Sequence, residues 1–251
     1  AHGATQAARA VGGRVVKEID GRAVLFAFAS EAAVGAAVPS LLARPEVAFV
    51  ERNGFMSLRS TPQRPAGQGQ NGSTTQGGVS PQVVSNDVAT GFQWHLTMIR
   101  KTAPLPALST TPPTIAVIDT GVDYTHTDLS GKVLLGLNTL TSTLDPFDDH
   151  GNGTAMAGIA AAKAGNGLYG EGVSPNSRIL AVKVLGPNGV GTFSNIAVGM
   201  SYARLYVPPA GVPAVRVLTM GVSGPPSALI ATQVNAIKIA GKVLVAAAGD
   251  F

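Results

Sequence analysis

The stretch from residue 114 to residue 129 limits what this chain can fold into more than any other. It opens with the run Thr-Ile-Ala-Val-Ile and continues directly as Asp119-Thr120-Gly121. A short β-branched run that follows two prolines and ends in a carboxylate and a glycine predicts a buried parallel strand. Open α/β sheets keep their functional side chains at the carboxyl ends of the strands. We therefore expect Asp119 to lie at that edge of a sheet, in a functional site.

The second half of the chain alternates between strand and helix patterns. We predict strands at 179–185, 215–222 and 242–248 and helices at 194–205 and 227–240. Strands separated by helices of about 10 to 15 residues imply right-handed crossovers. The predicted fold class is therefore α/β, a parallel sheet with helices on both faces. Because this sheet would be incomplete, ending on its last strand, we expect the sequence to be a fragment.

Composition excludes several function classes. Of 251 residues, 45% are apolar and 13% are charged, which indicates a buried core. The net charge is only +4 and the basic residues are scattered, so neither a nucleic-acid surface nor a nucleic-acid partner is expected. No apolar run approaches the roughly 20 residues of a membrane span, and no membrane partner is expected. The first residues form no signal peptide, which leaves the localisation unknown.

A smaller α+β unit is predicted within residues 1–60. Its expected elements are strands at 15–19, 23–28 and 47–51 and a helix between Ser30 and Pro45. Asp20-Gly21 is a hairpin turn pattern, and Ser30 followed by Glu31 is typical of a helix start. Residues 61–92 are crowded with glycine, proline, glutamine and serine and predict a disordered linker. The second domain is then expected to cover residues 93–251.

Residues 114–129 resemble, almost letter for letter, the aspartate motif of the subtilisin-like serine proteases, the subtilase or peptidase S8 family. Only Thr127 departs, standing where proline is usual. Residues 93–99 are similar to the start of the family's catalytic domain, and 47–51 to the last strand of its inhibitory pro-domain. The resemblance implies an inhibitor I9-like pro-domain, incomplete at its N-terminus, at 1–60 and the N-terminal part of a catalytic domain at 93–251.

The resemblance also implies an activity and partners. It implies a serine-type endopeptidase that hydrolyses peptide bonds, peptide or protein substrates, a pro-domain that acts in cis, and a secreted location. Two alternatives stay open for parts of the chain. Residues 1–60 could be an unrelated ferredoxin-like module, and the second domain could bind a nucleotide, although no Gly-x-Gly-x-x-Gly follows its first strand.

The catalytic positions of the family are degenerate in this chain. Asp119 matches the triad aspartate, but Asn152 stands at the position of the triad histidine. An asparagine does not titrate near neutrality, so it can neither accept nor return the proton of a serine. His150 would be the base only if Asn152 and Gly153 were an insertion, and we interpret it as a polar loop residue. This chain is therefore predicted to be inactive.

Two further departures point the same way. Asp250 stands where the family places the asparagine of the oxyanion hole, and a carboxylate accepts hydrogen bonds but cannot donate them. The nucleophile motif Gly-Thr-Ser-Met-Ala-x-Pro does not occur in the 251 residues, so the nucleophile serine is absent. The alternative function is therefore a non-catalytic pseudoprotease that serves as a peptide-binding or regulatory module.

The residues that resemble the family's substrate-binding edges are better preserved. One edge comprises Gly189, Val190, Gly191 and Phe193, and the opposing edge comprises Gly221, Val222 and Ser223. Two exposed strand edges can hold an extended peptide between them by strand addition. The alternative is a pair of glycine-rich turns.

No metal or other cofactor is expected. Residues 164–168 resemble a degraded form of a loop that holds calcium in some members of the family. They contain one asparagine and no acidic residue, so the sequence does not support a metal site.

Overall fold

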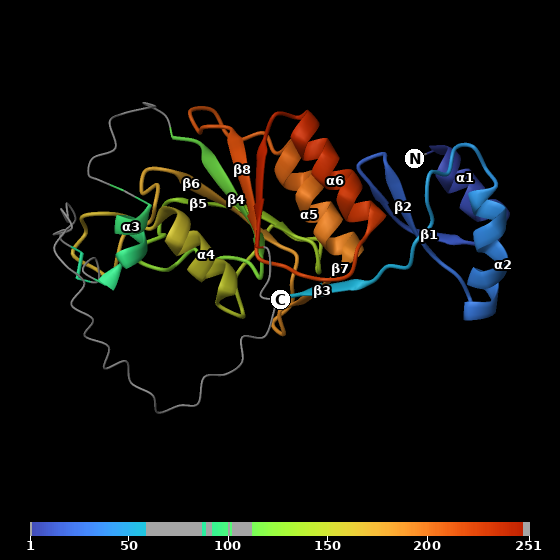
Figure 1. The fold of residues 1–251 in the computed structure, drawn as a ribbon, viewed down its shortest axis with the longest axis horizontal. Helices are drawn as coiled ribbons and strands as arrows, with labels where there is room; N and C mark the ends of the chain where they lie inside the picture. The colour runs from blue at the N-terminus through green and yellow to red at the C-terminus, as the bar shows by residue number, and fades with distance from the viewer. Residues whose placement is uncertain (1, 59–86, 89–91, 100, 102–111, 248–251) are drawn as a thin grey trace.

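The computed structural model describes residues 2–58, 87–88, 92–99, 101 and 112–247. Its centre is a sheet of five parallel strands in the order β5-β6-β4-β8-β9 (Figure 1). The strands are β4 (Thr114–Asp119), β5 (Val133–Asn138), β6 (Arg178–Lys183), β8 (Val215–Met220) and β9 (Val243–Ala246). The predicted α/β fold class is confirmed. Strand β5 was not among the predicted strands.

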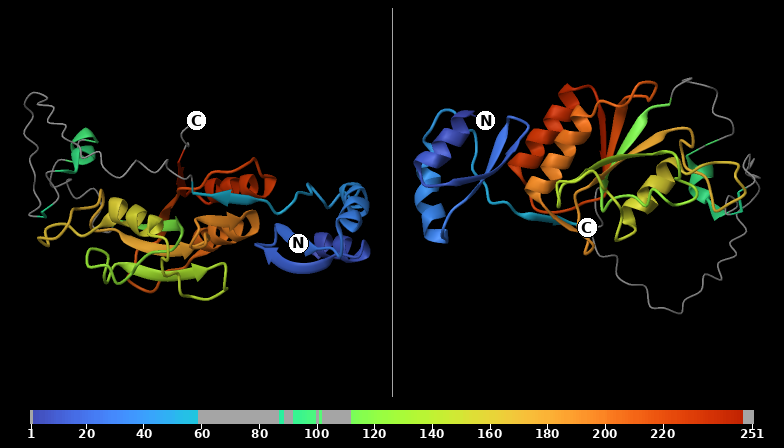
Figure 2. Two further views of the ribbon diagram at one scale, coloured as in Figure 1. Left: turned by 90° about the horizontal axis from the view of Figure 1, so that it is seen from below. Right: turned by 180° about the vertical axis from the view of Figure 1, so that it is seen from behind.

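Helices cover both faces of this sheet (Figures 1 and 2). Helix α4 (Asn152–Ala161) packs on one face, and α5 (Phe193–Leu205) and α6 (Ala228–Ile239) pack on the other. Side chains of β4 alternate between the two cores: Ala116 and Ile118 face α5, whereas Val117 faces α4. This period of two, with apolar side chains on both faces, explains why β4 is a continuous apolar run.

The N-terminal unit, residues 2–58, lies beside the N-terminal end of α5 and α6 (Figure 1). It contains α1 (His2–Ala10), the hairpin of β1 (Arg14–Ile19) and β2 (Ala23–Ala27), α2 (Glu31–Leu42) and β3 (Phe55–Ser57). The predicted hairpin is confirmed, and so is the helix capped by Ser30, whose hydroxyl accepts a hydrogen bond from the Ala33 N–H. Helix α1 was not predicted.

One predicted strand of the N-terminal unit is wrong. Residues 47–51 run as an extended segment with no strand partner among the described residues. Their β-branched and aromatic side chains suit a strand, but a strand also needs an edge to pair with. The segment instead leads to β3, which pairs with β7 (Val190–Thr192) in the larger domain.

The remaining described elements are short. Helix α3 (Trp94–Met98) lies within the segment that resembles the start of the catalytic domain. Most of the predicted linker, residues 61–92, lies outside the described residues, and the domain boundaries stay a prediction. Among the residues that the structure describes, no helix is both long and apolar enough to cross a membrane.

Candidate functional site

Asp119 and Asn152 meet at the carboxyl edge of the sheet. Asp119 is the last residue of β4 and is 1% exposed, and Asn152 is the first residue of α4. The Asn152 side-chain Nδ2 donates to Asp119 Oδ1 at 2.9 Å and to Asp119 Oδ2 at 3.0 Å. The Thr120 N–H donates to Asp119 Oδ1 at 2.7 Å. A neutral amide therefore stands where an imidazole would be needed for proton transfer.

Two glycines allow α4 to approach β4 this closely. Gly121 has a φ of +106°, which non-glycine residues rarely adopt. A Cβ on Gly153 would lie 1.9 Å from the Gly121 carbonyl oxygen and 3.2 Å from Asp119 Cβ. Any larger residue at Gly153 would push the helix away, so these glycines set the distance between Asn152 and Asp119.

The pKa values of the two buried carboxyl groups at this edge, Asp119 and Asp148, are shifted in opposite directions. Burial raises the pKa of Asp119, and the hydrogen bond from Asn152 offsets this rise in part. Burial also acts on Asp148, but hydrogen bonds from Thr154 and from the Gly151 N–H outweigh it and lower the pKa of Asp148. Asp148 thus serves as an ionised acceptor at the N-terminus of α4, where the helix dipole favours negative charge.

Lys183 forms an ion pair with Asp149 at the same edge of the sheet. It ends β6, opposite Asp119 in the parallel register, and is 3% exposed. Its Nζ donates to the Thr120 carbonyl at 2.5 Å and to Asp149 Oδ1 at 2.6 Å. Its hydrogen-bonding role is to tie the loop after β4 to the loop before α4.

His150 lies apart from Asp119. Its backbone N–H donates to Asp148 Oδ1, and its Nε2 lies 3.4 Å from where a Cβ on Gly189 would be. The imidazole therefore borders the Gly189 edge, and among the described residues no hydrogen bond joins it to Asp119. This geometry favours the interpretation of His150 as a loop residue over its assignment as a base.

The two predicted substrate-binding edges flank a strand of this same chain. Strand β3 pairs antiparallel with β7, and Leu58 N–H donates to the Gly189 carbonyl at 2.8 Å. On its other side, Ser57 and Ser223 exchange two backbone hydrogen bonds, each of 3.0 Å. Residues 55–58 are therefore held between both edges in the manner of an added strand.

Of the first two side chains of β3, Met56 packs against the larger domain and Phe55 faces solvent. Met56 is partly buried and packs against both the sheet core and the cluster that contains Phe193, whereas Phe55 is 63% exposed. A Cβ on Gly224 would lie 2.8 Å from Met56 Cγ, and its other near neighbours also belong to residues 55 and 56. The cleft is thus shaped around this strand.

Polar contacts dock the residues just before β3. Glu51 accepts from the Ala228 and Leu229 N–H groups and from the Ser227 hydroxyl at the start of α6. Asn53 Oδ1 accepts from the Ser194 N–H at the start of α5, at 2.9 Å. Both side chains satisfy N–H groups that lack partners within their helices. Ser194 therefore lies in the first turn of α5, in agreement with the helix predicted at 194–205.

The sequence did not reveal a carboxylate network beside residues 164–168. Asp87 accepts from the N–H groups of Gly165, Asn166 and Gly167, each at 2.9 Å, and Asn166 Nδ2 donates to Asp128 Oδ1. These N–H groups occupy the carboxylate oxygens that a calcium ion would need as ligands. The arrangement therefore does not fit calcium. Among the described residues, no three His, Cys, Asp or Glu side chains gather to hold a metal.

Two parts of the predicted site are not illustrated by the structure. Asp250 lies outside the described residues. The nucleophile motif does not occur in the 251 residues of the sequence.

Comparisons with known proteins identify the family to which this chain belongs. Residues 111–251 match the model of the subtilase family, Peptidase_S8. The chain is 54% identical over 89 residues to thermophilic serine proteinase of Bacillus sp. (strain AK1), covering 36% of this chain and 22% of that protein. It is 38% identical over 136 residues to thermitase of Thermoactinomyces vulgaris, covering 54% and 47%. The chain thus spans less than half the length of these relatives.

Among solved structures, the chain is similar to a cold adapted subtilisin-like serine proteinase. That similarity has 28% sequence identity and a TM-score of 0.48 over 56% of this chain and 47% of the other. The family match, by contrast, spans more than half of the 251 residues and includes Asp119, Asn152 and both edges of the cleft. This chain belongs to the subtilase family of serine proteases.

Proposed function

We propose that this 251-residue chain binds an extended peptide in the subtilase cleft without hydrolysing it. The observation that carries the proposal is the pairing of residues 55–58 with both cleft edges, next to a site in which Asn152 faces Asp119. Strand addition supplies the binding, because the backbone of β3 is paired on both sides. Catalysis would be missing, because among the described residues Asp119 accepts hydrogen bonds from Asn152 and Thr120 and from no base.

Strand β3 would also regulate the access of other peptides to the cleft. Residues 2–58 act as a pro-domain whose last strand covers the cleft in cis, and Glu51 and Asn53 anchor it on the two helix N-termini. An ion pair between Asp20 and Arg204, with side chains only 13% and 10% exposed, adds a third anchor. A peptide partner would therefore have to displace the chain's own strand.

A second candidate function is the endopeptidase activity typical of the family. The preserved cleft edges and the covering strand favour it, since they fit a precursor whose substrate site is blocked. Under this alternative, Asp119 would take part in peptide-bond hydrolysis, although this chain offers neither a histidine partner nor a nucleophile motif.

The proposal is tested with a cleft that has been freed of its own strand. Met56→Asp removes the apolar side chain that fills the cleft, so a labelled peptide Phe-Met-Ser-Leu should bind to this variant and be excluded by the wild-type chain. Adding Gly224→Ala should weaken this binding roughly tenfold or more, because the new methyl group would collide with the bound strand. Mass spectrometry should show the peptide intact.

Gly158→Ala provides the matched control. A Cβ at Gly158 meets no heavy atom within 4 Å, so the same glycine-to-alanine change should leave peptide binding unaltered. Peptide cleavage, or binding that is insensitive to Gly224→Ala, would contradict the proposal.

A further inference from the structure

Asparagine is followed by glycine at several places in this chain. In the described residues these pairs begin at positions 53, 152, 166 and 188, and a further pair at 71–72 lies outside them. Such pairs are reactive sites for spontaneous loss of the asparagine amide, because glycine lacks a side chain and lets its own backbone nitrogen reach the preceding side chain. All of the described pairs share this chemistry, so their surroundings decide which of them reacts.

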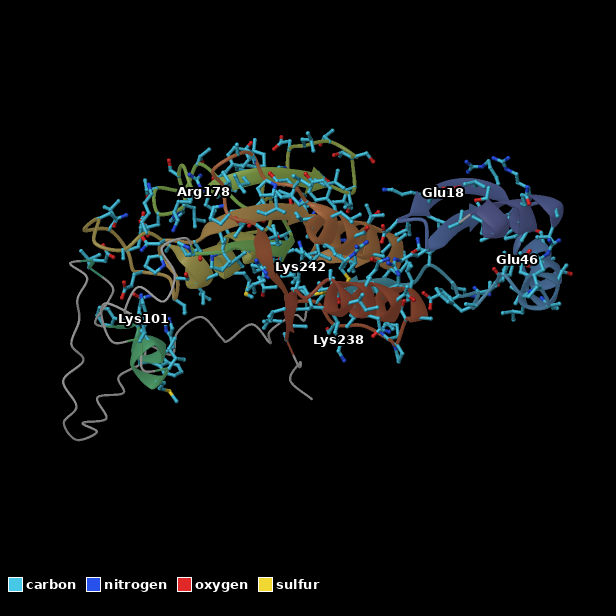
Figure 3. The ribbon with its side chains drawn as sticks, turned by 90° about the horizontal axis from the view of Figure 1, so that it is seen from above. Glu18, Glu46, Lys101, Arg178, Lys238 and Lys242 are labelled. Carbon is cyan, nitrogen blue, oxygen red and sulfur yellow. The ribbon has the colours of Figure 1, made fainter. Side chains whose placement is uncertain are left out.

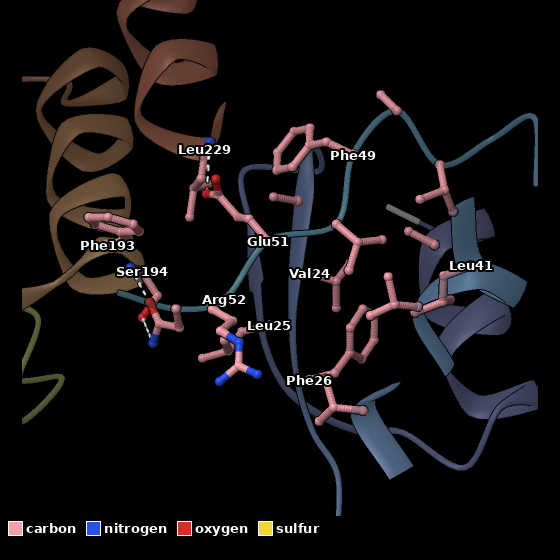
Figure 4. Close-up of a pocket in the computed structure, with 18 of the residues that line it drawn as sticks. Val24, Leu25, Phe26, Leu41, Phe49, Glu51, Arg52, Phe193, Ser194 and Leu229 are labelled. Atoms are coloured by element: carbon pink, nitrogen blue, oxygen red, sulfur yellow. Dashed lines mark hydrogen bonds between the residues drawn. The ribbon is translucent and has the colours of Figure 1, made fainter. Parts of the chain in front are cut away.

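Three of these asparagines are held by groups outside their own turn. Asn53 Nδ2 donates to Ser194 Oγ at 3.0 Å, and Figure 4 shows Ser194 at the start of α5. Asn152 Nδ2 donates to both carboxylate oxygens of Asp119, and Asn166 Nδ2 donates to a carboxylate oxygen at 2.8 Å. Each of these side chains must leave its partner before it can fold back on its own backbone. The contacts therefore slow the loss of the amide at all three positions.

Asn188 differs from the other three in its contacts. It is an exposed residue of the turn before β7, and among the described residues its Nδ2 donates to no other group. Its Oδ1 accepts from the Val190 N–H at 3.2 Å. That donor points at the oxygen on which negative charge develops when the side-chain carbonyl is attacked, as a donor of an oxyanion hole does. The side chain is thus held within its own turn, with its amide nitrogen free to leave.

The attacking nitrogen is also held only by this turn. The Gly189 N–H donates to the Gly186 carbonyl at 2.9 Å, three residues earlier in the chain. A turn at the surface opens locally without disturbing the sheet. By contrast, the Gly153 N–H donates to Thr120 Oγ1 at 3.0 Å, in a buried contact between α4 and the end of β4. Release of the nitrogen therefore requires less rearrangement at Gly189 than at Gly153.

We propose that Asn188 is a site of spontaneous deamidation, with water as the co-reactant, and that the product loosens the cleft edge that holds β3. The Gly189 nitrogen gives its proton to water and bonds to Asn188 Cγ, the Cγ–Nδ2 bond breaks, and the amide group takes up a proton and leaves as ammonia. Water then opens the imide ring. Cleavage at the α-carbonyl carbon gives isoaspartate, and cleavage at Cγ gives aspartate. In both cases one amide and one water become one carboxylate and one ammonium ion.

Isoaspartate at position 188 would change the shape of this edge. Its main chain runs through Cβ and Cγ, so it is one carbon longer than that of asparagine just before Gly189. The Gly189 carbonyl accepts from the Leu58 N–H at 2.8 Å, and a Cβ on Gly189 would lie 3.2 Å from Leu58 Cδ1. This close packing leaves no room for a longer turn in the same position. The modification should therefore loosen residues 55–58, which belong to this chain whatever the cleft binds.

The first test compares the folded full chain with the same chain unfolded in urea, both aged in a mildly alkaline buffer. Digestion and mass spectrometry then give the deamidation rate of each asparagine in the two states. The folded-to-unfolded rate ratio of Asn188 should exceed that of the other three described asparagines roughly tenfold or more, because only their side chains must first break hydrogen bonds to another segment. An equal or lower ratio for Asn188 would overturn the proposal.

Hydrogen exchange of the aged chain tests the effect on β3. Amides of residues 55–58 should exchange roughly tenfold faster or more once position 188 is isoaspartate. Residues around Glu18 and Glu46, which lie on the N-terminal unit away from the central sheet in Figure 3, should keep their rates. Asn188→Gln is the matched control, because a glutamine closes a larger imide ring more slowly and every other Asn-Gly pair stays in place. Faster exchange at 55–58 in the aged Asn188→Gln chain, or unchanged exchange in the aged wild-type chain, would contradict the proposed loosening.

Discussion

At the scale of single residues, the site depends on a buried carboxylate held by an amide. Asp119 receives three hydrogen bonds, two from Asn152 and one from the Thr120 N–H, yet burial still raises its pKa. A raised pKa means that the folded chain binds the proton more tightly than the unfolded chain does. Asp119 therefore contributes stability below its ordinary pKa near 3.8 and loses this contribution as the pH rises through its folded value.

Asp119→Asn should accordingly stabilise the chain at neutral pH. The substitution removes a buried charge and keeps an oxygen that can accept from Asn152, so we expect a gain of about 1 kcal/mol, or roughly 2–4 °C in Tm, at pH 7. The gain should disappear toward pH 3, where the carboxyl group of the wild-type chain is neutral in both states. Thermal unfolding of both proteins between these pH values measures the effect.

Asp123→Asn is the control of opposite sign. The Thr125 hydroxyl and N–H donate to Asp123 Oδ1, at 2.6 Å and 2.9 Å, and the hydroxyl hydrogen bond lowers the pKa of Asp123. Its contribution to stability is therefore present at neutral pH and lost as the pH falls. This variant should be destabilised at pH 7 and not at pH 3. If Asp119→Asn behaved in the same way, the description of Asp119 as a carboxylate strained by burial would be wrong.

At the scale of elements, Glu51 joins the extended segment to α6. One oxygen accepts from the Leu229 N–H at 3.0 Å and the other from the Ala228 N–H at 2.8 Å. Glu51→Gln replaces one acceptor with a donor and removes a negative charge from the helix N-terminus. We expect a loss of about 1 to 2 kcal/mol, measured as the shift of the urea unfolding midpoint.

Glu46→Gln is the comparison for this loss. Glu46 lies 3.9 Å from Arg44, and both side chains are exposed, so the substitution should change stability by less than about 0.5 kcal/mol. Equal losses from Glu46→Gln and Glu51→Gln would show that charge alone, rather than contact with α6, accounts for the effect.

The same scale shows what sequence patterns can and cannot predict. Strand β4 and helix α2 can be predicted from local sequence. Strand β4 is an apolar run that is buried on both faces, and α2 begins after a serine cap. Strand β3 has three residues and exists because β7, far along the chain, provides its partner. Residues 47–51 have the propensity of a strand but no partner. Strand pairing is a tertiary property, so local propensity overpredicts one segment and misses the other.

The candidate site also has parts that local motifs predict and parts that depend on tertiary contacts. Asp119, Asn152 and the two cleft edges could be located from local motifs, and the structure places them around one region of the sheet edge. The occupation of the cleft by residues 55–58 could not be predicted, because it depends on how the N-terminal unit docks. The contact of Asp87 with residues 165–167 escaped for the same reason, since it joins segments 78 to 80 residues apart.

At the scale of the whole molecule, the cleft that holds an extended strand and the positions of the catalytic residues can be considered separately. In the described residues an extended strand, β3, pairs with β7, and Asn152 rather than a histidine is hydrogen-bonded to Asp119. Because both a histidine and a nucleophile motif are missing, restoring one of them should not restore turnover. In subtilisin, removal of a single triad member lowers kcat by up to about 2 × 10⁶-fold.

The most direct test is labelling of the full chain and of Asn152→His with a fluorophosphonate, which reacts covalently with activated serines. Intact-mass spectrometry should detect no labelled chain in either protein, and a fluorogenic peptide should remain uncut over the same period. Stoichiometric labelling of a serine within residues 1–251 in either protein would contradict the account, because it would show an activated nucleophile where none is expected.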